Sequence, residues 1–118
     1  MKQTSDFTTG ELPPLLVKHR EELLLLAERR GLRNVRVFGS MVRGDYHDGS
    51  DVDLLVDAPP GTSALALCGL SIDAEQLLAR PVDVVTETCL YPSMREWVVR
   101  EAIPLLAART ATSFSWNM

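Results

Sequence analysis

The sequence predicts an α/β (α+β) fold, in which helices pack on a small mixed β-sheet of three to four strands. Three apolar, valine-rich runs, at 35–38, 52–56 and 81–85, are typical of buried strands. Around them, apolar residues recur with the period of an α-helix. We therefore expect the order helix, strand, turn, strand, helix, strand, helix and short strand, with the helices on one side and carboxylates at an open edge.

The length of the chain favours a single domain. Its 118 residues suffice for one hydrophobic core, but not for a catalytic domain with a separate substrate domain. We expect this domain at 11–107, between a flexible arm at 1–10 and a flexible tail at 108–118. The tail carries two aromatic residues, Phe114 and Trp116, which are either disordered or anchored on another chain.

The composition argues against several classes of function. Apolar residues make up 46% and charged residues 24%, as in ordinary globular proteins. There is no membrane-spanning run and no signal-peptide core, so we expect a cytoplasmic location. A net charge of −4 argues against sequence-independent nucleic-acid binding. Cys68 and Cys89 lack metal-ligand spacing and are predicted to be free, partly buried thiols.

The first predicted helix begins at Pro13 and ends at Gly31. Proline suits the first turn of a helix and glycine suits its end. The four leucines at 23–26 exceed one amphipathic stripe, so they form either a wide core face or, in part, a partner surface.

The first strand runs into Gly39 and Ser40. Glycine lets the backbone approach a ligand closely, and serine at the mouth of a short helix can cap it while neighbouring N–H groups point at an anion. These residues are therefore predicted to bind phosphate, although an ordinary turn and helix cap is the alternative.

Arg43 lies just beyond this turn. Its guanidinium could bind a triphosphate, or it could form an ion pair with Asp45 or Asp48, and the sequence does not favour either. Tyr46 and His47 follow in the same loop, where they either contact a nucleotide or are simply exposed.

Asp51 and Asp53 begin the second strand. Residues two apart in a strand share a face, so the two carboxylates project together, roughly 6.5 to 7 Å apart along the backbone. Such carboxylates repel each other unless a cation lies between them, and oxygen ligands select Mg²⁺, Mn²⁺ or Ca²⁺. Combined with the preceding turn, they indicate metal-assisted nucleotidyl or phosphoryl transfer. A solvated loop end or a casual Ca²⁺ site is the alternative.

The turn at 57–61 contains two prolines and ends the second strand. Thr62 or Ser63 then caps a helix that ends near Ala79 and covers one face of the sheet.

Asp83 is the only polar residue in the third apolar run. A buried acid is costly unless it is paired, hydrogen-bonded or bound to a metal. If this strand lies beside the second, Asp83 joins Asp51 and Asp53; otherwise it faces water on an edge strand. Glu87 comes too late in the strand to join the same cluster.

The last helix is predicted from the segment 91–93, where Ser93 and Glu96 have capping-box spacing. A short edge strand at 103–106 follows it. The residues expected to bury one side of the helix are Trp97, Val98 and Ala102.

The central stretch resembles the signature of the DNA polymerase beta-like nucleotidyltransferase superfamily, and specifically the minimal nucleotidyltransferase (MNT) group. The residues that carry this resemblance are Gly39, Ser40, Arg43, Gly44, Ser50, Asp51 and Asp53. Ten residues separate the Gly-Ser turn from the first aspartate, and the resemblance covers roughly residues 15–106. The combined motif is far more specific than a lone glycine pattern.

The resemblance implies a reaction. Gly39 and Ser40, with Arg43, would hold the triphosphate of ATP, the substrate, while the carboxylates of Asp51 and Asp53 would hold Mg²⁺. It also places Asp83 as the ligand of a second Mg²⁺ ion, where it would help to deprotonate the attacking hydroxyl. AMP is transferred and pyrophosphate leaves.

The MNT group also implies a partner. Its members resemble the antitoxin half of two-gene systems whose other half is a HEPN-domain ribonuclease toxin, and they transfer AMP to a tyrosine of that toxin. We therefore expect a hetero-oligomer with a HEPN-domain toxin. The alternatives are an antitoxin that blocks its toxin by contact alone, and a small-molecule nucleotidyltransferase whose acceptor site is completed by a second subunit.

Overall fold

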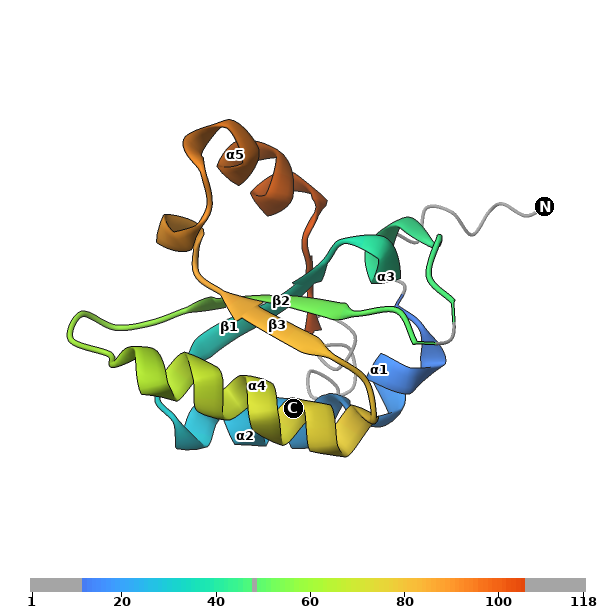
Figure 1. Cartoon of the computed structure of the whole chain (residues 1–118), viewed down its shortest axis with the longest axis horizontal. Coiled ribbons are helices and arrows are strands. Elements are labelled where there is room, and N and C mark those ends of the chain that lie inside the picture. The colour runs from blue at the N-terminus through green and yellow to red at the C-terminus, as the bar shows by residue number, and fades with distance from the viewer. Residues whose placement is uncertain (1–11, 48, 106–118) are drawn as a thin grey trace, which may run out of the picture.

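The computed structural model describes residues 12–47 and 49–105 (Figure 1). The predicted arm at 1–10 and the predicted tail at 108–118, with its two aromatic residues, lie outside the described residues. Within the described ranges, no helix is long and apolar enough to cross a membrane.

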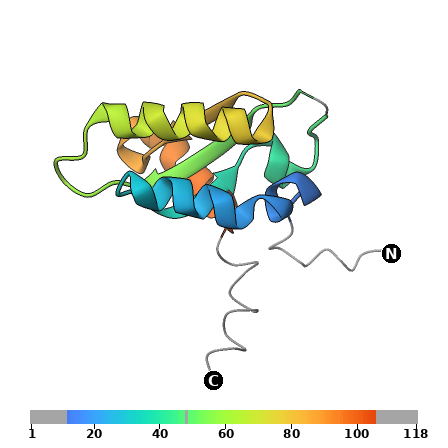
Figure 2. The ribbon, with the colours of Figure 1, turned by 90° about the horizontal axis from the view of Figure 1, so that it is seen from below.

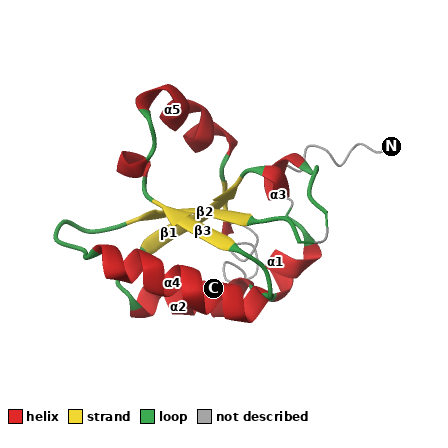
Figure 3. Ribbon diagram, viewed as in Figure 1, coloured by secondary structure: helices red, strands yellow, loops and turns green. Residues whose placement is uncertain are grey.

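A mixed four-stranded sheet forms the centre of the molecule, in the order β3-β2-β1-β4 (Figure 3). β1 (Arg33–Phe38) pairs antiparallel with β2 (Val52–Asp57), which pairs parallel with β3 (Val82–Val85). β4 (Ile103–Pro104) pairs antiparallel with β1 at the opposite edge. The predicted mixed sheet is therefore confirmed, and its proline lies on an edge strand, where the missing N–H is tolerated.

The first predicted helix is divided into α1 (Pro14–Lys18) and α2 (Arg20–Arg29). The expectation of one continuous helix was wrong because the backbone of His19, at φ −102° and ψ 14°, leaves the helical region. The Nδ1 atom of His19 lies 2.9 Å from Glu22 Oε1, which connects this residue to the first turn of α2.

The longest helix, α4 (Ala64–Leu78), has the predicted boundaries. Its cap is Ser63, whose side chain accepts a hydrogen bond of 2.8 Å from the amide of Leu65. The helix ends at Ala79, which adopts the left-handed conformation typical of a helix C-terminus.

α2 and α4 lie side by side on one face of the sheet (Figure 2). Alternate strand residues, including Val37, Leu54 and Val82, are buried in the core that these helices cover. In the leucine run, Leu23 is buried, and Leu24 and Leu26 are partly buried against the core, whereas Leu25 is 47% exposed. The run is therefore mainly a wide core face.

α5 (Pro92–Glu101) lies on the opposite side of the sheet from α2 and α4, so the helices are not all on one side (Figure 1). Its Val98 is fully buried. Arg95 connects the helix to the short 3₁₀ helix η2 (Glu87–Cys89), because its Nε donates to the carbonyl oxygen of Glu87 at 2.9 Å.

Two predictions for α5 were wrong. Ser93 and Glu96 form no capping box, because the N-cap is Tyr91, two residues before Ser93, with no side-chain cap bond and with Pro92 in the first turn. Trp97 is 49% exposed, since only one narrow face of the helix meets the rest of the molecule. The two cysteines are free, as predicted, but both are exposed rather than partly buried.

Candidate active site

β2 and β3 bring two of the predicted acidic residues together. In their parallel pairing, Asp53 and Asp83 are Cα partners. The residues that flank them, such as Val52 and Leu54, are buried in the core beneath α2 and α4. Because side chains alternate along a strand, both carboxylates project from the other face, the side on which α5 lies. The condition for Asp83 to join the other acids is therefore met.

Asp53 has an unusual charge environment. Burial, followed by the charges of Asp83 and Asp51, raises its pKa from 3.8 to about 6. The nearby guanidinium of Arg43 opposes this shift, and Glu101 adds to it. Negative charge is therefore concentrated at the start of β2, which is the condition under which a cation is bound favourably.

The glycine turn lies directly against the Asp53 carboxylate. Gly39, at φ 82° and ψ −153°, joins β1 to the short helix α3 (Ser40–Arg43). A side chain at this position would overlap Asp53 Oδ2, so only glycine allows this approach. Ser40 is the first residue of α3 and does not cap it, because Gly39 occupies the cap position.

Glu101, the last residue of α5, enters this turn. Its Oε2 accepts a hydrogen bond of 2.7 Å from the amide of Gly39, and both of its carboxylate oxygens lie 3.3 Å from Arg43 Nη1. Arg43 also lies 3.8 Å from Asp45, at the limit of an ion pair, whereas Asp48 is outside the described residues. The ion-pair alternative for Arg43 is therefore realised chiefly with a residue that the sequence reasoning missed.

One signal in the sequence could have identified Glu101. An acidic residue at the end of a helix opposes the helix dipole, so its presence there suggests a specific partner.

A family model matches most of the amino-acid sequence of this chain. The model of the nucleotidyltransferase domain covers residues 17–105. This chain belongs to that family.

Two similar proteins share most of their length with this nucleotidyltransferase. Protein adenylyltransferase MntA of Thermococcus cleftensis is 38% identical over 96 residues, which cover 81% of this chain and 94% of the relative. A solved structure assigned as a minimal nucleotidyltransferase is 46% identical, with a TM-score of 0.68, and the match covers 75% of this chain and 91% of that one. The predicted family and enzyme class are therefore confirmed.

A third comparison supports the fold alone. A chain of a toxin–antitoxin crystal structure with AMP-PNP superposes on this nucleotidyltransferase with a TM-score of 0.64 at 21% identity. The match covers 83% of this chain and 88% of the other.

The carboxylates have the chemistry of a magnesium site. Three aspartates offer the oxygen donors that Mg²⁺ prefers. A cation would relieve the repulsion from Asp83 and Asp51 that, after burial, raises the pKa of Asp53. As they stand, the described residues contain no group of three or more His, Cys, Asp or Glu that could hold a metal ion. Asp51 and Asp83 are exposed, so their side chains can rotate without disturbing the core.

The loop between α3 and β2 is closed by Ser50. Its hydroxyl accepts from the amide of His47 at 2.8 Å, and its own amide donates back to the carbonyl oxygen of His47 at 2.9 Å. Tyr46 and His47 line a pocket of about 320 Å³ beside α1, together with Met41 and Arg80. None of the three aspartates lines this pocket, so these two loop residues are oriented toward α1.

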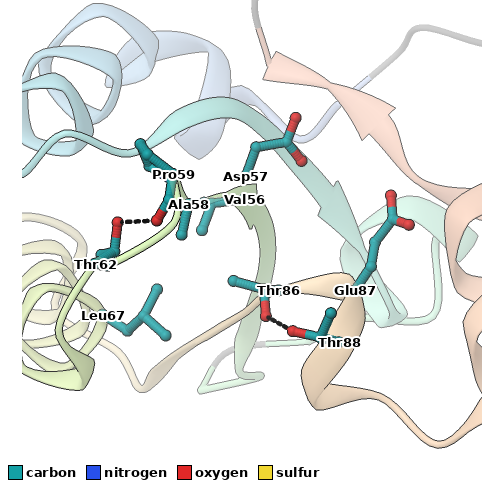
Figure 4. A pocket seen from close by; sticks show the side chains of 10 residues that line it. Val56, Asp57, Ala58, Pro59, Thr62, Leu67, Thr86, Glu87 and Thr88 are labelled. Atoms are coloured by element: carbon teal, nitrogen blue, oxygen red, sulfur yellow. Dashed lines mark hydrogen bonds between the residues drawn. The ribbon is translucent and has the colours of Figure 1, made fainter.

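A larger pocket of about 450 Å³ lies at the other end of β2 and β3 (Figure 4). Its lining includes Asp57 and Glu87, both of which also contact the buried cation Arg36. Arg36 donates to Asp57 Oδ1 at 2.7 Å and to Glu87 Oε2 at 3.4 Å. Glu87 therefore belongs to a separate charge network, in agreement with its exclusion from the aspartate cluster.

Proposed function

We propose that this nucleotidyltransferase is a Mg²⁺-dependent protein adenylyltransferase. It transfers AMP from ATP to a tyrosine hydroxyl of a partner HEPN-domain toxin and so acts as the antitoxin. The observation that carries this proposal is the in-register pair Asp53 and Asp83 beside the Gly39 turn. It occurs in a chain that is 38% identical to a protein adenylyltransferase.

The turn would bind the triphosphate. Backbone amides at Gly39 and Ser40 are donors for phosphate oxygens, and the Arg43 guanidinium adds a positive charge with planar donor geometry. Glycine is required at position 39 because the backbone must pass directly beside Asp53. The phosphates would thus lie next to the carboxylates.

The carboxylates of Asp51, Asp53 and Asp83 would hold one or two Mg²⁺ ions, which neutralise phosphate charge when bound. The acceptor oxygen attacks the α-phosphorus, and the bond from that phosphorus to the bridging oxygen of pyrophosphate breaks. Asp83 would receive the proton of the attacking hydroxyl, a role supported by its exposure on the same face as Asp53. The products are the AMP-modified hydroxyl and pyrophosphate.

A protein acceptor is supported by the surface of α5. Three large apolar side chains of the helix and its N-cap are exposed: Tyr91 at 74%, Met94 at 41% and Trp97 at 49%. Grouped apolar exposure of this kind is typical of surfaces that contact another protein. The helix also supplies Glu101 to the site, so a protein bound on α5 would lie near the reacting groups.

The test is transfer of label from [α-³²P]ATP, in the presence of Mg²⁺, to the product of the adjacent gene, which the proposal expects to be the HEPN-domain toxin. Label on a tyrosine of the toxin, lost in Asp51→Asn and Asp53→Asn variants that remain folded, is the expected result. Tight complex formation without label would instead identify an antitoxin that acts by contact alone. Label on neither protein, with pyrophosphate released only when a small hydroxyl compound is added, would identify a small-molecule enzyme.

A further inference from the structure

The Glu101 carboxylate occupies the donors of the glycine turn. Its Oε2 accepts the amide hydrogen of Gly39 at 2.7 Å, and the same group pairs with Arg43 at 3.3 Å. The Glu101 side chain is only 16% exposed, so this contact is largely shielded from water. A short, charge-assisted hydrogen bond of this kind is among the stronger polar contacts in proteins.

Helix stability does not explain this position. Glu101 is the last residue of α5, where a negative charge opposes the partial negative charge of the helix C-terminus. Another acid of the same helix, Glu96, instead pairs with Arg100 at 2.9 Å on the exposed surface. The contacts to the turn therefore offset an unfavourable location, which indicates that Glu101 serves the turn rather than the helix.

The proposed nucleotide needs the same two donors. The single N–H of Gly39 donates at 2.7 Å to Glu101, so a phosphate oxygen can take it only if Glu101 leaves. The charge of Glu101 already acts on nearby Asp53, and it would repel a triphosphate placed between them. A carboxylate and a phosphate offer the same chemistry to this turn, namely anionic oxygen acceptors.

We propose that Glu101 is a positioning residue that holds the phosphate subsite in its binding geometry and is displaced by the triphosphate of the nucleotide. While the nucleotide is absent, the carboxylate keeps the Gly39 amide and the Arg43 guanidinium in place. When the triphosphate binds, its oxygens take both donors and Glu101 moves away with the end of α5. This inference rests on the proposed binding of ATP at the turn.

The test compares ligand binding by Glu101→Gln with that by Glu96→Gln, which makes the same change of charge on the same helix. Binding of ATP with Mg²⁺, and of inorganic triphosphate with Mg²⁺, is measured by calorimetry. We expect Glu101→Gln to bind both ligands at least about fivefold more tightly than the wild type, equivalent to about 1 kcal/mol. Glu96→Gln should bind both as the wild type does.

The gain should be equal for the two ligands, because the competition concerns phosphate and not the base. A Trp116→Phe background leaves Trp97 of α5 as the only tryptophan. The fluorescence of Trp97 should change when ATP binds to the chain with Glu101. The change should be much smaller in Glu101→Gln, because the contacts of residue 101 with Gly39 and Arg43 are already weakened.

Three results would overturn the inference. If the wild type binds ATP and transfers AMP, but Glu101→Gln binds no more tightly, Glu101 is not displaced and the proposed function stands. If Glu101→Gln binds both ligands more weakly, the carboxylate supports the bound nucleotide instead. If neither the wild type nor the variants bind ATP or triphosphate, the proposed function fails together with the inference.

Discussion

Asp53 and Asp83 are Cα partners in the parallel pairing of β2 and β3, and both project to the face of the sheet on which α5 lies. Asp83 comes 30 positions after Asp53 in the chain, but no contact between loops is needed to bring them together. The strand register alone does so, because parallel neighbours in register present their side chains to the same side. The placement of these two acids is thus determined by the register of the sheet.

Asp53→Asn should stabilise the metal-free chain at neutral pH. The pKa of Asp53 is about 6 in the folded chain and 3.8 in the unfolded reference. The folded state therefore binds more protons between these values, and the free energy of unfolding falls as pH rises through that window. After allowance for partial exposure of the group, we expect a gain of about 1–2 kcal/mol at pH 7.5.

Urea unfolding without divalent cations, followed by circular dichroism from pH 7.5 down to pH 4, measures this gain. It should shrink toward pH 4, where the Asp53 carboxyl is protonated in the folded wild type. Glu28→Gln, a change at an exposed acid on α2, is the control and should show no such trend. If Asp53→Asn is no more stable than the wild type at any pH, the raised pKa of Asp53 is contradicted.

Mg²⁺ should reverse this order of stability. A ligand that binds only the folded state stabilises it by about 2.7 kcal/mol when present at 100 times its dissociation constant. The melting temperature of the wild type should therefore rise with Mg²⁺ and ATP and return to its initial value with EDTA. Asp53→Asn should respond little, since its amide cannot replace the charge of the carboxylate. Equal shifts in both proteins, measured by scanning calorimetry, would exclude Asp53 as a ligand.

Gly39→Ala should impair both the fold and the site. Position 39 has a positive φ, which costs alanine about 1–3 kcal/mol, and the added Cβ would displace the Asp53 carboxylate. We expect loss of AMP transfer and a lower melting temperature. Gly69→Ala is the matched control in α4, where the new methyl group meets only the flexible guanidinium of Arg30.

The control should be neutral or slightly stabilising. Replacing glycine by alanine in a helix raises the stability by about 1 kcal/mol. This offsets the loss of the exposed ion pair between Arg30 and Asp73, which the methyl group displaces. Transfer activity should be unchanged in Gly69→Ala. Equal damage by the two substitutions would mean that the close approach at Gly39 has no special role.

Removing the buried cation Arg36 should lower the free energy of unfolding more than removing one of its two acidic partners. Its side chain is 10% exposed, whereas the partners Asp57 and Glu87 are 53% and 43% exposed. Arg36→Met leaves both carboxylates in water, so its cost comes mainly from lost hydrogen bonds and packing, about 1–3 kcal/mol. Asp57→Asn should cost less, about 1 kcal/mol, because the guanidinium keeps Glu87 and the carbonyl oxygen of Asn34.

Chemical denaturation of the wild type, the two single variants and the double variant gives their free energies of unfolding. Together these form a double-mutant cycle. A cost for Asp57→Asn that exceeds that of Arg36→Met would show that an unpaired buried charge dominates this network instead.

Local sequence signals were sufficient for the glycine turn and for the first two aspartates. Strand alternation and the motif spacing are both read within about twenty residues, so Gly39, Asp51 and Asp53 could be identified before their neighbours were known. Asp83 needed one further assumption, that β3 lies beside β2, and the parallel pairing confirms it.

The contact between Glu101 and the glycine turn could not be predicted in this way. Gly39 is 62 residues earlier in the chain than Glu101, and no periodic pattern connects the two. The side of the sheet on which α5 lies could not be predicted either, because Val98 is the only fully buried side chain of this helix. The division at His19 was missed since its backbone change leaves the apolar pattern of the leucines intact.

The sheet separates two packing layers that can diverge at different rates. Leu54 lies in the main core, whereas Leu55 and Val98 are buried outside it, on the side of α5. The exposed residues of the ten-residue helix α5 could therefore change during evolution, and with them the proposed contact with a partner, while the strands that carry Asp53 and Asp83 stay constant.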